Sequence, residues 1–337
     1  MKVIRPIKSG DLDALLGLAQ GAGVGFTSLP PERRFLQEKI ELSERSFATN
    51  AAEAGHERYM FVLEDVASGR IGGCCAVEAA CGLDEPFYNY HVGTTVHAHR
   101  ELEIYNQLPT LYLSNDYTGT SVLCSLYLSP DFRSGGAGHL LSRSRFLFMA
   151  QHPRRFAAKV IAEMRGVSDE RGRSPFWEGL GRHFFSIDYG RAEHLVGMGN
   201  KAIIAELMPK HPIYTVLLPP EARAVLGQVH PQTAPALHLL ERENFRMQGY
   251  IDIFDGGPTV EAPLAEIRSI KRSRLVKAVA GAQLAGGLPH LVANTALADY
   301  RCTLANLDPA DSTATLPPAT IEALGVRVGD IVRVTPV

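Results

Sequence analysis

The chain has 337 residues, which is enough for two medium domains or for one large core with an appendage. Its content of 45% hydrophobic and 21% charged residues is ordinary for a globular protein, and a formal net charge of −2 excludes a strongly basic nucleic-acid surface. No apolar stretch approaches the roughly 20 residues of a membrane helix, and the N-terminus lacks the apolar core of a signal peptide. We therefore expect a soluble protein that binds neither nucleic acid nor membranes.

The first 82 residues predict a strand, two helices and a hairpin. After the strand "VIRPI", a helix capped by Ser9 carries an apolar stripe at i, i+3, i+4 and i+7, formed by Leu12, Leu15, Leu16 and Ala19. A second helix is expected over 31–48, where Pro residues occupy the start. Residues 58–82 then predict two strands that the turn at 64–70 joins.

The middle of the chain combines one ambiguous segment with one clear one. Residues 82–118 are rich in Tyr, Asn, His and Asp and have weak periodicity, so they form either a decorated sheet or a long functional loop. Residues 121–128, "SVLCSLYL", are apolar on both faces, as in a central strand. A glycine-rich loop follows, and then a helix that ends near Ala150, before Pro153.

The remaining elements alternate in type as far as residue 274. We expect strands at 158–166 and 202–208, a closing strand and turn at 250–258, and helices at 174–185 and at 233–245, the last capped by Thr233. The two helices each precede a strand, which weakly indicates duplication. The tail from 275 loses aromatic residues and ends in a short helix, a Gly-Asp turn and a Val-rich strand, which predicts a small β-rich appendage. The expected division is 1–190, 191–274 and 275–337.

The glycine loop, "SPDFRSGGAGHLL" at 129–141, is the strongest chemical signal. A nucleotide P-loop needs a Lys after the glycines, and the dinucleotide fingerprint needs a third glycine, and neither is present. What remains is R-x-x-G-x-G, formed by Arg133, Gly136 and Gly138, between a buried strand and a helix. Glycines let successive N–H groups point inward at a helix N-terminus, which favours a bound phosphate. The alternative is a plain turn in which glycine supplies a positive φ.

This loop, in this order of elements, resembles the pyrophosphate loop of the GNAT superfamily of acyl-CoA N-acyltransferases. The resemblance implies an α+β fold, with a mixed, mostly antiparallel central sheet flanked by helices and with residues 1–190 as the acyl-CoA-binding core. It also implies that the strand before the loop splays from its neighbour to admit the thioester arm, past the backbone of Leu126, Tyr127 and Leu128. A second GNAT-related half, 191–274, would complete the active site. The acyl-CoA contacts expected are Leu126, Leu128, Arg133, Ser134, Gly135, Gly136, Ala137 and Gly138.

Longer strings, in order and spacing from residue 1 to about 274, resemble the arginine N-succinyltransferase family. They are "GFTSLP", "FVLED", "EPFYNYHVGTTVHA", "LSNDYTG", "SPFWEGLGRHFF", "AELMPKHPIYT", "GQVHPQTAPA" and "YIDIFDGGPT". The resemblance implies transfer of succinyl from succinyl-CoA to the α-amino group of L-arginine, as the first step of arginine degradation. It also implies a proton donor at His230, the His of "GQVHPQ", and a succinyl-CoA contact at Leu126.

The chemistry of such a transfer suits a histidine. The amine must attack as the neutral base, and the departing thiolate needs a proton, which imidazole, with a pKa of ~6.5, can supply near neutral pH. His230 precedes Pro231, which favours an extended backbone, and lies just before the helix expected at 233–245. The alternative reading is an ordinary surface-loop histidine.

The charged ends of the two substrates need partners of opposite charge. A guanidinium calls for carboxylates and a succinyl carboxylate for a cation. Candidates for the first are Asp84, Glu85 and Asp116, and candidates for the second are Arg100, Lys210 and Arg182. For any one of them a solvated surface charge is the commoner role, so none is counted among the expected site residues.

The cysteines and a cluster of histidines suggest other chemistry only weakly. An odd count of five, at 74, 75, 81, 124 and 302, fits reduced thiols in the cytoplasm. Together with His91, His97 and His99, the first three match no strong zinc spacing, so no metal site is expected. Apolar surroundings argue against a thiol nucleophile, so we expect direct attack, with no permanently bound cofactor.

Two rivals to this hypothesis remain. One is an acyltransferase for a different amine, such as ornithine, or for a different acyl-CoA. The other is a non-catalytic subunit of a mixed oligomer. Whichever of these functions holds, we expect an oligomer with a second copy or with a related chain.

Overall fold

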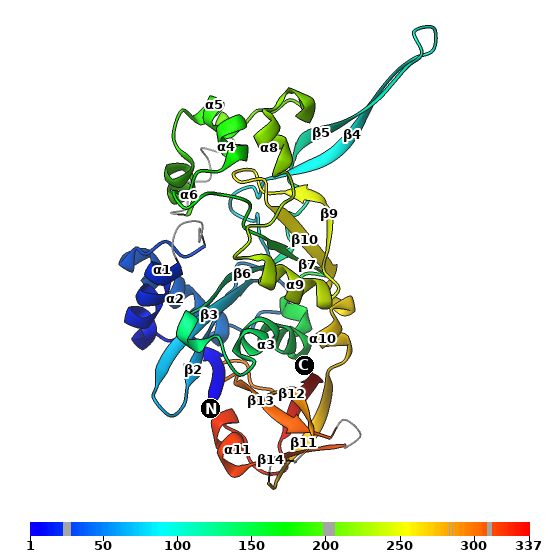
Figure 1. The fold of residues 1–337 in the computed structure, drawn as a ribbon. Coiled ribbons are helices and arrows are strands. Elements are labelled where there is room, and N and C mark those ends of the chain that lie inside the picture. Colours follow the sequence, from blue (N-terminus) through cyan, green and yellow to red (C-terminus); the bar gives the residue numbers. More distant parts are fainter. Residues whose placement is uncertain (23–27, 198–205, 283, 285, 309–311) are drawn as a thin grey trace.

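A single mixed sheet runs through the whole molecule. The computed structural model describes residues 1–22, 28–197, 206–282, 284, 286–308 and 312–337. In these ranges fifteen strands pair in the order β14-β11-β15-β12-β13-β1-β2-β3-β6-β7-β10-β9-β4-β5-β8 (Figure 1). Among them only β6–β7 and β11–β14 are parallel ladders. The predicted α+β fold with a mostly antiparallel sheet and flanking helices is confirmed.

The N-terminal elements follow the sequence pattern closely. They are β1 (Lys2–Pro6), α1 (Leu12–Ala22), α2 (Arg33–Ala48), β2 (Arg58–Asp65) and β3 (Arg70–Glu78). Helices α1 and α2 bury one stripe against the face of β2 and β3 that carries Met60 and Ala76. The β2–β3 hairpin turns at Gly69, whose φ of 68° suits a residue without a Cβ.

The ambiguous segment 82–118 is a sheet ribbon rather than a loop. Strands β4 (Asn89–His99) and β5 (Ile104–Ser114) pair along their full length. Figure 1 shows this ribbon projecting from the body of the molecule. Its free end is exposed on both faces, so no apolar stripe marked it as a pair of strands.

The central strand and the helix after it have the predicted bounds. Strand β6 (Ser121–Leu128) lies between β3 and β7, and helix α3 (Ala137–Gln151) ends before Pro153. The α3 side chains between Leu140 and Met149 are buried against the sheet. No described helix is long and apolar enough to span a bilayer.

The segment after α3 corrects two predictions. The helix expected at 174–185 is two short helices that break at Leu180, whose φ of −135° and ψ of −71° are not helical. The strand expected at 202–208 is wrong at Glu206 and Leu207, which are helical. Residues 202–205 lie outside the described part of the chain. The elements here are β7 (Lys159–Glu163), α4 (Pro175–Gly179), α5 (Gly181–Phe185), α6 (Tyr189–Gly197), β8 (Ile213–Tyr214), α8 (Pro220–Ala224), α9 (Ala234–Arg242), β9 (Arg246–Ile251) and β10 (Pro258–Pro263).

The C-terminal tail is β-rich, as predicted, and it continues the central sheet. It contains α10 (Arg268–Lys271), β11 (Arg274–Ala280), β12 (Leu288–Ala293), β13 (Cys302–Leu307), β14 (Thr313–Leu316), α11 (Pro318–Leu324) and β15 (Ile331–Pro336). Strand β13 joins β1 at the pair Ile4↔Cys302. From β13, the Leu304 side chain reaches to 3.0 Å from the position that a Cβ on Gly136 would take. The tail therefore packs against the glycine loop.

Candidate active site

A large cleft opens where β6 and β7 part. Its volume is about 1680 Å³. The two strands pair only at Ser121↔Val160 and Val122↔Ile161, so the β7-facing edge of β6 has no ladder partner in β7 beyond Val122. This is the splay that the resemblance implies. It leaves backbone groups of β6 available to an extended ligand.

Strand β6 also carries an irregularity in the cleft. Its register with β3 shifts between Cys74 and Ala76, and Ser125 takes a left-handed φ of 54°. Such a bulge adds a residue to one strand and redirects its side chains. A non-glycine residue held at positive φ beside a cleft is typical of a functional position.

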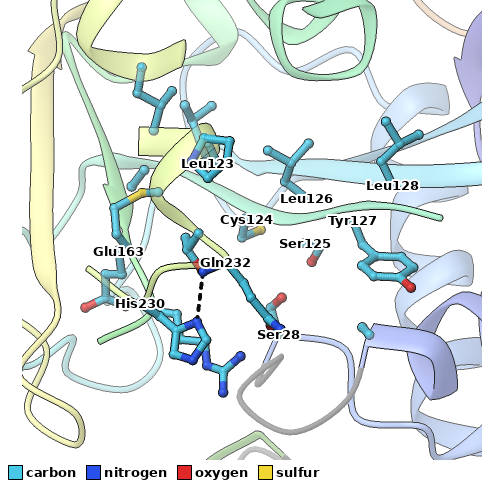
Figure 2. Close-up of a pocket in the computed structure, with 18 of the residues that line it drawn as sticks. Ser28, Leu123, Cys124, Ser125, Leu126, Tyr127, Leu128, Glu163, His230 and Gln232 are labelled. Atoms are coloured by element: carbon cyan, nitrogen blue, oxygen red, sulfur yellow. Dashed lines mark hydrogen bonds between the residues drawn. The ribbon is translucent and has the colours of Figure 1, made fainter. Parts of the chain in front are cut away.

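The bulged strand sends different side chains to its two faces. Leu123, Leu126 and Leu128 pack in the cluster that contains α3, whereas Cys124 and Tyr127 pack with α1 and α2. Figure 2 shows the three leucines on one side of the strand, and Cys124, Ser125 and Tyr127 on the other. The predicted contacts Leu126 and Leu128 both line the cleft.

The glycine loop forms one end of the same cleft. Arg133, Ser134, Gly135, Gly136, Ala137 and Gly138 all line it. Gly135 and Gly136 have φ values of 60° and 76°, and Gly136 is the N-cap of α3. The N–H groups of Gly136, Gly138 and His139 donate no hydrogen bond within the described part of the chain. These donors, at the positive end of a helix dipole, make a cradle for an anion.

Contacts from outside hold the loop in shape. The Lys2 Nζ donates to the carbonyl oxygens of Phe132 and Ser134, at 3.0 and 2.9 Å. The Arg133 Nε donates to the Leu128 carbonyl at 3.1 Å. Because Lys2 engages carbonyl oxygens, it supports the loop without using the N–H donors of Gly136, Gly138 and His139.

His230 lies on the wall of the cleft, near the end of β7. The backbone N–H of His230 donates to the Arg165 carbonyl at 2.8 Å, and its ring Nδ1 accepts from the backbone N–H of Gln232 at 3.2 Å. Partial burial lowers the pKa of His230 below its ordinary value, and the positive charge of Arg165 lowers the pKa further. The His230 carbonyl accepts from the N–H groups at the start of α9, whereas the expected Thr233 side-chain cap makes no such bond.

A carboxylate that the sequence reading missed lies on the same side of β6 as His230. Glu163, at the end of β7, accepts from the Asn89 Nδ2 at 2.8 Å, and Asn89 is only 1% exposed. Figure 2 shows Glu163 and His230 on the side of β6 to which Cys124 and Ser125 point. Among the missed charges, Arg58, Glu78 and Glu163 line the cleft.

The six charged residues proposed to bind the ends of the two substrates lie outside the cleft. None of the six lines the cleft. Asp84 contacts His56 at 3.1 Å, Asp116 accepts from the Tyr250 hydroxyl at 2.7 Å, and Arg182 pairs with Glu178 at 2.9 Å. Among the described residues, Glu85, Arg100 and Lys210 make no contact that brings them into the cleft.

The thiols have the character expected of inert side chains. Burial raises the pKa of Cys75 to about 12 and that of Cys81 to about 11, and it raises the pKa of Cys74 and Cys124 as well. In the described ranges no three His, Cys, Asp or Glu side chains gather in a way that would hold a metal ion.

Comparisons with known proteins match this chain to one family over almost its whole length. A family model described as the beta subunit of arginine N-succinyltransferase matches residues 2–269, and a model of its C-terminal domain matches 272–336. Proteins named arginine N-succinyltransferase from Salmonella schwarzengrund (strain CVM19633) and Salmonella agona (strain SL483) are 52% identical over 334 residues, which is 99% of this chain and 97% of each relative. The solved structure of arginine/ornithine succinyltransferase subunit AI from Pseudomonas aeruginosa superposes with a TM-score of 0.92 at 44% identity, covering 100% of this chain and 98% of that one.

Proposed function

The chain belongs to the arginine N-succinyltransferase family of acyl-CoA N-acyltransferases, and from this premise we propose its reaction in detail. It transfers the succinyl group of succinyl-CoA to the α-amino group of L-arginine, and it releases N2-succinyl-L-arginine and CoA in the breakdown of arginine. One observation carries the proposal. The glycine loop, the splayed strand and His230 all line one continuous cleft.

The donor is proposed to lie along β6. The pyrophosphate of CoA binds the N–H groups at the start of α3, within the loop Arg133, Ser134, Gly135, Gly136, Ala137 and Gly138. The pantetheine arm follows the unpaired edge of β6, where the backbone groups of Leu126 and Leu128 can pair with its amides. The thioester then reaches the bulge at Ser125.

The transfer is proposed to be direct. The amine nitrogen forms a bond to the thioester carbon, and the carbon–sulfur bond breaks as the tetrahedral intermediate collapses. The arginine ammonium gives up two protons in all, of which the departing sulfur takes one and solvent takes the other. His230 is the group that delivers the proton to sulfur. Its lowered pKa leaves it largely neutral near pH 7, so it can first accept that proton from the amine.

A thiol-release assay tests the reaction. Purified protein with succinyl-CoA and arginine is expected to release free CoA and to form a product heavier than arginine by one succinyl group. Ornithine is the second candidate acceptor, because the Pseudomonas aeruginosa relative is named for both amino acids. Turnover with ornithine and none with arginine would transfer the assignment to ornithine.

The proposal also covers the oligomeric state and the cellular location of the protein. The family model and the solved relative are both described as subunits, which supports an oligomer with a second copy or a related chain. Light scattering of the purified chain measures this, and a monomer with full turnover would contradict it. The cytoplasmic location inferred from the reduced thiols stays a prediction that cell fractionation tests.

A further inference from the structure

One wall of the cleft carries charged and polar groups that neither the glycine loop nor His230 uses. Arg58 on β2, Glu78 on β3, and Cys124 and Ser125 on β6 line this wall, and Lys39 on α2 lines it as well. The strands place three of these side chains together. Arg58 pairs with Glu78 across β2–β3, and Ala76, two residues before Glu78 on β3, pairs with Cys124 across β3–β6. The wall lies beside the bulge of β6, on the face away from α3.

The Arg58 guanidinium is held in place but only partly used. Its side chain is 11% exposed, and its Nη1 pairs with the Glu78 carboxylate at 2.7 Å. Its Nη2 meets only the Cys124 sulfur, at 3.4 Å, and its Nε is buried with no hydrogen-bond partner in the described part of the chain. A thiol is a weak acceptor. The Nε–Nη2 edge, one of the two with which arginine binds a carboxylate through two hydrogen bonds, therefore lacks a strong acceptor.

Ser125 provides a second donor without a strong acceptor. The residue is 3% exposed, and its Oγ has no hydrogen-bond partner among the described residues. Buried hydroxyl groups are normally paired, and an unpaired one in a cleft wall indicates a ligand atom that completes it. Cys124, the residue before Ser125 on β6, contacts the Arg58 guanidinium, and Arg58 and Ser125 both line the cleft.

We propose that Arg58 and Ser125 form a subsite for a substrate carboxylate. This inference rests on the proposed function, which offers two sources of that chemistry. One is the free carboxylate at the end of the succinyl chain, and the other is the α-carboxylate of the amino-acid acceptor. In the first case the subsite selects succinyl-CoA over uncharged acyl-CoAs, and in the second it selects an amino acid over a plain amine.

Pairs of matched substrates distinguish the two sources. Butyryl-CoA replaces the succinyl carboxylate with a methyl group, and agmatine is arginine without its α-carboxylate. Arg58→Lys keeps the charge and the pairing with Glu78 but loses the planar edge. Ser125→Ala removes only an unpaired hydroxyl, so the fold is expected to remain stable. Arg34→Met is the control, because this arginine lies exposed on α2, paired with Glu38, and does not line the cleft.

The expected result is a selective loss. Arg58→Lys lowers kcat/KM about 10- to 100-fold for the carboxylate-bearing member of one pair, and changes the other member little. Ser125→Ala shifts the same pair in the same direction by about tenfold or less, and Arg34→Met shifts neither. Loss for succinyl-CoA places the acyl end at Arg58, and loss for arginine places the α-carboxylate there.

Binding measurements separate this proposal from the reaction itself. If the wild-type chain releases no thiol with any acceptor, the proposed function fails, but calorimetry still compares the affinities for succinyl-CoA and butyryl-CoA, and for arginine and agmatine. A preference for the carboxylate that disappears in Arg58→Lys supports the subsite. Equal affinities in the wild type, or an unchanged preference in both variants, would overturn it.

Discussion

Replacing Gly138 with alanine tests the proposed pyrophosphate cradle, because the added methyl group is expected to have opposite effects on stability and on binding. Gly138 is the second residue of α3, and a Cβ there would meet no atom within 4 Å. The fold therefore has room for the methyl group. Since Gly138 lines the cleft, the methyl group would occupy the space in which we propose that the phosphate binds.

The two magnitudes follow from the local geometry. Alanine is favoured over glycine in a helix by about 0.5–1 kcal/mol, and the gain is smaller in the first turn, so the free energy of unfolding should rise by a few tenths of a kcal/mol. A hydrogen bond to a charged group contributes about 1.5–3 kcal/mol. Displacing the phosphate from the Gly138 N–H is therefore expected to weaken CoA binding by about 10- to 100-fold.

Calorimetry with CoA and thermal unfolding measure the two effects separately. The matched control is Gly17→Ala on α1, where a Cβ also meets nothing within 4 Å and which does not itself line the cleft. The control should be stabilised with unchanged CoA affinity. If Gly138→Ala binds CoA as tightly as the wild type, then the pyrophosphate does not lie on this helix end and the loop assignment is wrong.

Three further predictions concern His230 and the thiols. His230→Ala should lower kcat by about 10²- to 10⁴-fold while the calorimetric affinity for succinyl-CoA stays near the wild-type value, and unchanged turnover would remove His230 from the reaction. Arg165→Gln should raise the pKa of His230 toward its ordinary value, because a nearby cation disfavours the imidazolium, and a pKa that stays low in an NMR titration would contradict this cause. With the pKa of Cys75 raised to about 12 and that of Cys81 to about 11, a disulfide reagent at pH 8 should find about one thiolate in a thousand or fewer at these sites. Fast reaction of either thiol in the native protein would refute that, and all five cysteines should react after unfolding.

Local patterns were enough to predict the elements that form the donor side of the cleft. The apolar run at 121–128 and the glycines after it specify a central strand and a helix N-terminus through short-range effects, namely burial and backbone freedom. The Gly-Asp turn and the Val-rich run likewise predicted α11 and β15 at the end of the chain. In each case the residues that decide the structure are neighbours in the sequence.

The charged wall of the cleft could not be predicted because it depends on pairing between distant strands. Arg58 and Glu78 stand at the ends of apolar runs, where a charge is usually solvated, and only the β2–β3–β6 register turns them toward the cleft. The candidates in 82–118 were chosen for local composition. Arg100 lies at the tip of the ribbon, away from the cleft, whereas Asp84, Glu85 and Asp116 lie beyond the paired strands at its base and do not line the cleft. Glu163 was missed for the same reason, because its partner Asn89 is 74 residues away.

The contact between Leu304 and the glycine loop has a thermodynamic consequence. The loop is supported from behind by a strand that the chain adds only after residue 300. Linkage requires that any free energy by which docking of the C-terminal strands favours CoA binding is returned in full when CoA favours their docking. A tail that strengthens CoA binding is therefore itself held more firmly when the cleft is occupied.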